Sequence, residues 1–288
     1  MRIHEPDEAG SSCLEAGGRY LGMEGQAMSV YNRAAASYER VGPPFFSYFG
    51  RRIVDIVGVP EASRVLDVAC GAGAVLLAAV ERVGPRGVIV GVDCASAMVD
   101  RARSEIRHRG VSNAFVTHMD ALALAFPANV FDAVLCGFAL NALPVPGLAL
   151  SEFSRVLRVQ GRVGLIVSEG WWWEGDDRWQ WHHTLLDALG IRIDQEPRRF
   201  AAPQNLLEML TNQGFERVSV STENYPLVFA DVDEWWNWTW SHGYRQILER
   251  MSTSQLERYR VTCFEHLQDR PVEGRLQVFL AVGMKPST

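Results

Sequence analysis

Lysine is almost absent from this sequence. The 288 residues include 28 Lys and Arg side chains, and Lys285 is the only lysine among them. Walker-type phosphate loops, Schiff-base enzymes and short-chain dehydrogenases with a Tyr/Lys pair all require a lysine in the site. The sequence therefore excludes these lysine-dependent chemistries.

Long apolar runs and an excess of basic charge are also missing. No run approaches the roughly 20 residues that cross a bilayer, and the first residues lack the basic and apolar blocks of a secretory signal. We therefore expect a cytoplasmic protein without a membrane span. The net charge of −6 and the pI near 5.7 argue against nucleic acid as a partner, because binding to a phosphate backbone relies on Lys and Arg.

Cysteine is sparse, and no two cysteines form a C-x-x-C pair or lie near histidines at the spacing of zinc ligands. We expect reduced thiols and no metal site. The five residues concerned are Cys13, Cys70, Cys94, Cys136 and Cys263.

The rest of the composition, 48% hydrophobic and 22% charged, is typical of a soluble globular protein. Residues 1–27 are rich in Gly, Ser and Glu, and we expect a flexible tail there. Residues 28–288 are predicted to form a single domain, as a monomer or homodimer. Segments at about 28–50, 171–200 and 231–272 are expected to build helical caps over the carboxyl edge of its sheet.

Strand and helix patterns alternate through the middle of the chain, which predicts an α/β fold with a doubly wound, mostly parallel sheet. We expect strands at 64–69, 87–92, 113–118, 131–137, 162–168, 216–222 and 275–284, and helices at 73–83, 96–109, 146–158, 179–190 and 203–214. Gly161 is predicted to cap the helix before the fifth strand.

Two helices are predicted before the first strand. Tyr31–Arg40 forms one, with Tyr31 and Tyr38 on one face, and a second restarts after Pro44 with an apolar face that includes Phe45 and Phe49.

The segment 65–73, VLDVACGAG, is a strand followed by a tight loop of small residues that opens a helix. Such a loop lets backbone N–H groups approach an adenosine-containing ligand. It lacks the G-x-G-x-x-G spacing that serves the pyrophosphate of nicotinamide cofactors. Acidic residues follow at two later strand ends, Asp93 and Asp120.

Together with GVDCASAMVDRAR, FDAVLCGFALNAL and the EFSRVLRVQGR segment, this loop resembles class I S-adenosylmethionine-dependent methyltransferases. The likeness is to the ubiquinone/menaquinone C-methyltransferase-like group, which includes natural-product methyltransferases. One departure is Ala69, which stands where the family motif has its first glycine. The resemblance implies a seven-stranded Rossmann-like sheet and S-adenosylmethionine as cofactor.

The resemblance also implies roles for individual residues. Asp67 and the backbone of Ala69, Gly71 and Gly73 would hold the methionine end of the cofactor, and Asp93 would accept both ribose hydroxyls. The adenine would lie among Cys94, Met98 and the Asp120–Ala121 pair. Cys136 and Gly137 would line the amino-acid end, and Tyr31 and Tyr38 would close over the cofactor.

All nine tryptophans fall into two clusters, 171–181 and 235–240, outside the predicted sheet core. They either pin the cap to the sheet or line a pocket for a large apolar acceptor. If the acceptor must lose a proton, the candidate bases are His182, His183, His242 and Glu169. The chain lacks the [D/N]-P-P-[Y/F/W] motif of nucleic-acid amino-methyltransferases and the clustered carboxylates of metal-dependent catechol enzymes.

The leading hypothesis is a metal-independent methyltransferase that acts on a hydrophobic quinone-like or polyketide-like molecule. The alternatives are a cyclase or isomerase that retains the fold and cofactor, a cofactor-binding accessory protein, and, more distantly, a nicotinamide-dependent reductase.

Overall fold

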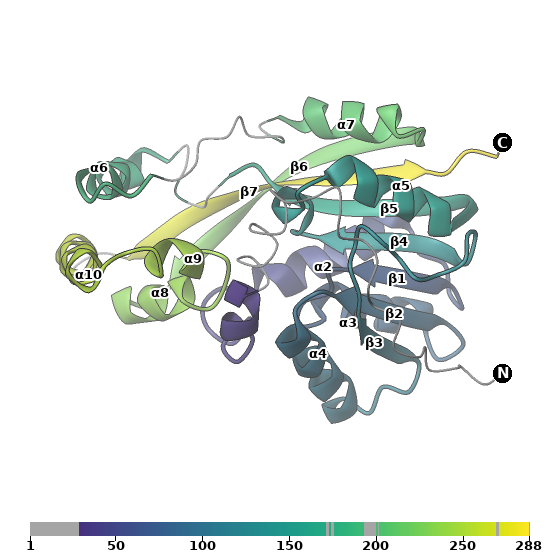
Figure 1. Ribbon diagram of the computed structural model, residues 1–288, viewed down its shortest axis with the longest axis horizontal. Coiled ribbons are helices and arrows are strands. Elements are labelled where there is room, and N and C mark those ends of the chain that lie inside the picture. Colours follow the sequence, from purple (N-terminus) through teal and green to yellow (C-terminus); the bar gives the residue numbers. More distant parts are fainter. Residues whose placement is uncertain are drawn as a thin grey trace, which may run out of the picture.

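The computed structural model describes residues 29–170, 173, 176–192, 200, 202–268 and 271–287 (Figure 1). The tail expected at 1–27 lies outside these residues, as do Trp171 and Trp172. Within the described ranges, every helix is too short or too polar to cross a bilayer.

A seven-stranded sheet in the order β3-β2-β1-β4-β5-β7-β6 forms the centre of the fold. Strands β1 to β5 run parallel, and β7 is antiparallel to both β5 and β6. The predicted mostly parallel α/β sheet is confirmed. The strands are β1 Arg64–Val68, β2 Val88–Asp93, β3 Ala114–His118, β4 Phe131–Gly137, β5 Leu157–Ser168, β6 Glu216–Phe229 and β7 Val272–Met284.

Helices cover both faces of the sheet, and each face has its own apolar core. One core contains the buried sides of α2 (Phe45–Val57), α3 (Ala74–Val83) and α4 (Ser96–His108). The other contains those of α5 (Pro146–Val156) and α7 (Pro203–Asn212). Adjacent residues of β1 enter opposite cores, Val65 the first and Leu66 the second, as expected for a strand buried on both faces.

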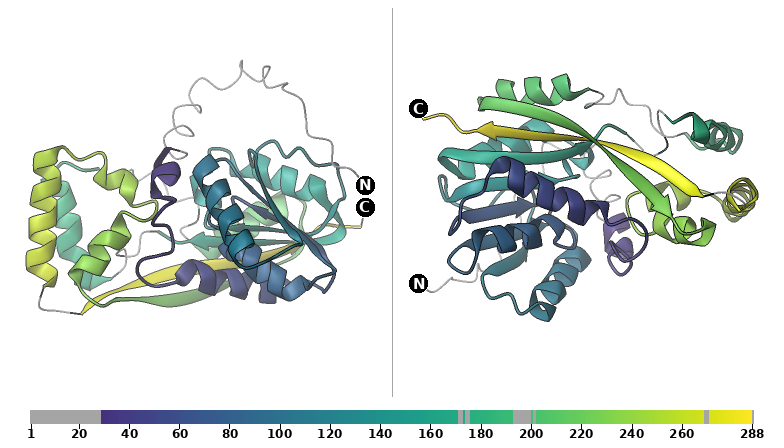
Figure 2. Two further views of the ribbon diagram at one scale, coloured as in Figure 1. Left: turned by 90° about the horizontal axis from the view of Figure 1, so that it is seen from below. Right: turned by 180° about the vertical axis from the view of Figure 1, so that it is seen from behind.

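Strands β6 and β7 continue past the end of β5 as a two-stranded ribbon. Residues 224–229 pair with 272–277, whereas β5 pairs only with 278–284. The ribbon leads to a group of helices at one end of the molecule (Figures 1 and 2). We call this group the cap; it comprises α6 Gln180–Ala188, α8 Val232–Thr239, α9 Arg245–Leu248 and α10 Thr253–Leu267.

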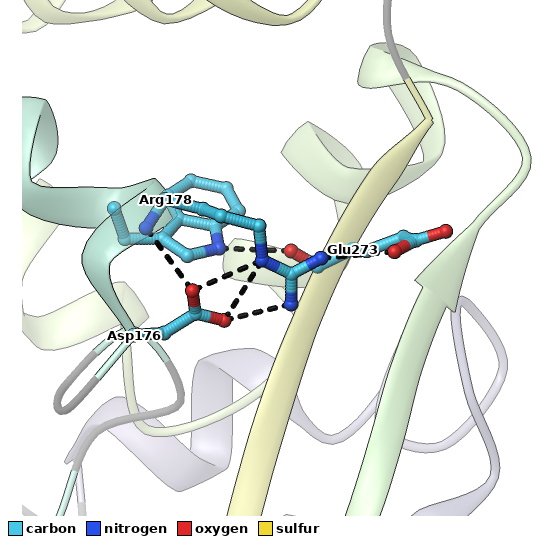
Figure 3. A network of polar contacts seen from close by, with 4 residues as sticks. Asp176, Arg178 and Glu273 are labelled. Atoms are coloured by element: carbon cyan, nitrogen blue, oxygen red, sulfur yellow. Dashed lines mark hydrogen bonds and ion pairs between the residues drawn. The ribbon is translucent and has the colours of Figure 1, made fainter.

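The two tryptophan clusters meet inside the cap. Trp179 stacks on Trp235 with ring centroids 5.9 Å apart, and both are buried, as are Trp173 and Trp238. An ion-pair network fixes the short turn Asp177–Trp179 to the ribbon (Figure 3). Arg178 contacts Asp176 and Glu273, and the Trp179 indole N–H donates to the Glu273 carbonyl at 2.8 Å.

Two local predictions are wrong. The first helix covers only residues 29–34. Residues 35–40 form turns that are held by hydrogen bonds, such as the one from Tyr38 N–H to the Ala34 carbonyl. Gly161 does not cap a helix, because α5 ends at Val156 and β5 begins at once. Gly161 instead allows a tight backbone approach, since a Cβ there would lie 2.8 Å from the Arg158 carbonyl oxygen.

The only lysine joins the last strand to the start of β5. The Lys285 ammonium donates to the Leu157 carbonyl at 2.8 Å and to the Asn129 side chain at 2.9 Å. Partial burial lowers the pKa of this ammonium.

The loop between β1 and α3, residues 69–73, has three residues in the left-handed region, and we call it the glycine loop. Gly71 and Gly73 have φ of 51° and 98°, and Ala69 has φ of 55°. Glycine adopts this conformation without steric cost, whereas the Cβ of alanine crowds its own backbone there. Ala69, the departure from the family motif, thus occupies a backbone conformation that favours glycine.

We therefore predict that Ala69→Gly stabilises the protein by about 0.5–1 kcal/mol, because relief of the left-handed strain exceeds the added entropy of the unfolded chain. Urea denaturation measures the change. Ala78→Gly, within the right-handed helix α3, is the matched control and should destabilise by about 1 kcal/mol or more. Destabilisation by Ala69→Gly would contradict the prediction.

Candidate active site

A pocket opens at the carboxyl ends of β1 and β4. The glycine loop and the buried Asp67 side chain contribute one part of its lining. Gly137 and Phe138 at the end of β4 contribute another, with Phe46 of α2 and Tyr38 and Glu39 from the segment before it. The carboxyl edge of a parallel sheet is where open α/β folds bind their ligands.

Asp93 joins the two loops beside the pocket. Its Oδ2 accepts a hydrogen bond from Gly71 N–H, and its Oδ1 accepts one from Ala95 N–H, both at 2.8 Å. Burial raises the pKa of Asp93, and the two hydrogen bonds from backbone N–H groups offset part of that shift. Each carboxylate oxygen has a second lone pair, so the side chain retains the capacity to accept two further hydrogen bonds.

Asp67 is buried and lines the pocket, yet neither of its carboxylate oxygens accepts a hydrogen bond from the described residues. Burial raises its pKa well above the usual value, and the nearby Leu76 backbone N–H lowers it only in part. An unpaired buried carboxylate is costly. A cationic group that entered the pocket would relieve this cost.

Residues 29–40, the N-terminal segment, lie between the cap and the sheet (Figure 2). Tyr31 and Tyr38 pack against Ala95 and Met98 at the start of α4, with their ring centroids 6.3 Å apart. Burial and the nearby Asp93 carboxylate raise the pKa of Tyr31 to about 12. Both tyrosines therefore lie beside the loops that carry the site.

Asn32, which sequence analysis did not identify, caps α4. Its Oδ1 accepts a hydrogen bond from the Ala97 backbone N–H at 2.9 Å, within the first turn of the helix. No local pattern could have identified it, because the cap comes from a segment distant in the sequence.

Five further residues predicted to bind the cofactor do not line the pocket. Cys94 is exposed, Met98 and Ala121 are buried, and Asp120 is exposed with its Oδ1 accepting from Leu122 N–H at 2.8 Å. Cys136 is buried beside Gly137, and its burial raises the pKa of the thiol to about 12.

None of the four candidate bases lines the pocket. His182 is in the cap core, where its Nε2 is 2.7 Å from the Tyr259 hydroxyl and burial lowers its pKa to about 3. His242 donates from Nδ1 to the Trp238 carbonyl at 2.8 Å, and burial lowers its pKa to about 4. His183 and Glu169 are half-buried.

Seven residues that line the pocket were not among the predicted site residues. Cys70, Ala72, Ala74 and Val75 belong to the glycine loop and the start of α3, and the other three are Glu39, Phe46 and Phe138. Phe46 was foreseeable only as a core residue of the second helix. Glu39 and Phe138 both have left-handed backbone conformations, with φ of 57° and 60°, which no residue-type pattern indicates for Glu or Phe. In the described part of the chain, no three His, Cys, Asp or Glu side chains are grouped to hold a metal ion.

Comparison with known proteins agrees with this geometry. A family model described as a methyltransferase domain matches residues 65–161. The nocamycin O-methyltransferase of Saccharothrix syringae is 33% identical over 231 residues, covering 75% of this chain and 81% of that protein. A demethylmenaquinone methyltransferase of Geobacillus kaustophilus is 31% identical over 207 residues, covering 66% of this chain and 88% of that protein.

Among solved structures, the YcgJ protein from Bacillus subtilis matches with a TM-score of 0.57 and 21% identity, covering 84% of this chain and 100% of that one. This likeness concerns the fold. With the two sequence relatives and the site geometry, it leads to one conclusion: the chain belongs to the class I S-adenosylmethionine-dependent methyltransferases, and S-adenosylmethionine is its cofactor.

Proposed function

We infer that this methyltransferase acts on a hydrophobic small molecule of the aromatic, quinone or polyketide type. The observation that carries the proposal is the pocket itself, which Tyr38, Phe46 and Phe138 line together with the glycine loop. Phe46 is stacked on Tyr38 and edge-on to Phe138, with ring centroids 5.0 and 5.2 Å away. Such walls suit a flat apolar acceptor.

The names of the two relatives support the same class of acceptor. One is a nocamycin O-methyltransferase. The other is a demethylmenaquinone methyltransferase, whose name states that it acts on a quinone. We extend a small-molecule acceptor, as these names indicate for the relatives, to this chain, and we infer its apolar character from the aromatic lining of the pocket.

The residues around the pocket fit the cofactor. In our proposal the unpaired Asp67 carboxylate faces the cofactor's ammonium group, and the remaining lone pairs of Asp93 accept the ribose hydroxyls. The amides of Ala69, Gly71 and Gly73, with Cys136 and Gly137, surround the methionine end. Around the adenine we propose Cys94, Met98, Asp120 and Ala121, with Tyr31 and Tyr38 as the cover.

The bound cofactor supplies an electrophilic methyl group on a sulfonium. The chain holds the acceptor in line with that methyl and keeps water away, which are the main sources of rate in such a displacement. An aromatic face also stabilises a nearby cation by about 0.5–2 kcal/mol. We retain four candidate bases that do not line the pocket: His182, His183, His242 and Glu169. Each of them could act only on a part of the acceptor that extends beyond the pocket.

We predict that Asp93→Ala weakens S-adenosylmethionine binding by more than about tenfold, or about 1.4 kcal/mol, because it removes the ribose acceptor and the link between two loops. Isothermal titration calorimetry measures the affinity. Asp100→Ala, on the exposed side of α4, is the matched control and should bind normally. Unchanged affinity of Asp93→Ala would contradict the assignment.

Asp67→Asn should have opposite effects on stability and binding. An acid whose folded pKa is raised costs stability above its unfolded pKa of about 3.9, so the amide stabilises the free protein at neutral pH, and this gain shrinks as the pH falls toward that value. Binding should weaken because the ammonium loses its counter-charge. Urea denaturation at two pH values and calorimetry give both quantities; lower stability with unchanged binding would refute the proposal.

The acceptor class is tested with S-adenosylmethionine labelled in its methyl group and a panel of naphthols, quinols and polar amines. We expect label in the apolar aromatic compounds, and a KM at least about fivefold higher for Phe46→Ala, because an apolar contact is lost. Phe115→Ala, on an exposed position of β3, is the control. Label only in polar amines would refute the proposed class, and substrate conversion without transfer of label would indicate a cyclase or isomerase.

A further inference from the structure

Glu39 is the one pocket acid in the described residues that the proposed cofactor site does not use. It follows Tyr38 in the turn before α2, and it lines the pocket together with Asp67. Asp67 is fully buried in β1 and Glu39 is half-buried. The two carboxylates therefore approach the pocket from different segments, and Glu39 comes from the same segment as the aromatic Tyr38.

The Glu39 carboxylate is held by a single side-chain hydrogen bond. The Ser47 hydroxyl donates to Oε1 at 3.2 Å, and the Ser47 backbone N–H also acts on the carboxylate; both contacts lower its pKa. The charged groups that act on Glu39 are Arg101 and Glu105 of α4, with opposite effects, and neither forms an ion pair with it. Burial is the largest effect and raises the pKa of Glu39. A carboxylate in this setting is a stronger base than one in water.

We propose that Glu39 is the general base of the methyl transfer and that the acceptor carries a phenolic or enolic hydroxyl. This inference rests on the proposed function above. The hydroxyl donates a hydrogen bond to Oε2. As the acceptor oxygen bonds to the methyl carbon, the methyl–sulfur bond breaks, its electron pair remains on sulfur as S-adenosylhomocysteine forms, and the hydroxyl proton passes to Glu39 and then to solvent.

Two probes separate proton removal from other roles. The hydroxyl of 1-naphthol is neutral at pH 7, whereas the enol of 2-hydroxy-1,4-naphthoquinone is already ionised. Glu39→Gln keeps the size of the side chain and its bond from Ser47. We expect it to lower kcat on 1-naphthol by about 100-fold or more and to change kcat on the ionised probe by less than about threefold.

The pH profile gives an independent readout. In the wild type, kcat/KM on 1-naphthol should rise with pH as Glu39 loses its proton. This rise should be absent in Glu39→Gln and partly restored in Glu39→Asp. The affinity for S-adenosylmethionine should stay within about twofold, which also shows that the variant folds. Glu61→Gln, which changes an exposed acid that does not line the pocket, is the control.

Three results would overturn the inference while leaving the proposed function intact: unchanged kcat in Glu39→Gln, equal loss on both probes, or a tenfold loss of S-adenosylmethionine affinity, which would assign Glu39 to the cofactor. If the wild type methylates no phenol or enol but does methylate other apolar compounds, no base is needed. The inference then fails, and the proposed function stands. If it methylates no apolar compound, both proposals fail.

Discussion

The site depends on one carboxylate. Asp93 accepts hydrogen bonds from Gly71 and Ala95, so a single side chain fixes the loop after β1 to the loop after β2. The parallel register makes this possible, since Val68 and Val92 are partners and both strands end at the same edge. The glycine loop can then remain small and open toward the pocket, because its position is set by a neighbour rather than by bulky side chains of its own.

A second set of contacts connects this edge to the cap. The N-terminal segment holds α4 through Asn32 and holds the end of α9 through the ion pair of Arg33 with Glu249. The Arg245 guanidinium of α9 donates hydrogen bonds to the same glutamate and to the Arg33 carbonyl. The β6–β7 ribbon supports the cap from the other side. Among the described residues, the N-terminal segment and the ribbon both connect the cap to the sheet. The N-terminal segment also contacts the glycine loop, since a Cβ at Gly71 would lie 3.9 Å from the Tyr38 ring.

Sequence reasoning was most successful where the signal is local. Apolar strands such as Val88–Asp93 and helices such as Ala74–Val83 are specified by their own residues, and the parallel part of the sheet was predicted from them. The turns at 35–40 were not predicted, because contacts with α2 and α4 determine them. The left-handed Glu39 and Phe138, which both line the pocket, were missed for the same reason. The tryptophan clusters were located outside the sheet, but their stacking through Trp179 and Trp235 depends on tertiary packing.

The single lysine has a practical consequence. The Lys285 ammonium donates hydrogen bonds to Leu157 and Asn129 at the start of β5. This end of the strand is opposite to the one that leads to the ribbon and the cap. Reagents that couple to lysine amines would find no such group in the pocket, the N-terminal segment or the cap. A label attached through this side chain would therefore lie at the opposite end of β5 from the cap and the pocket.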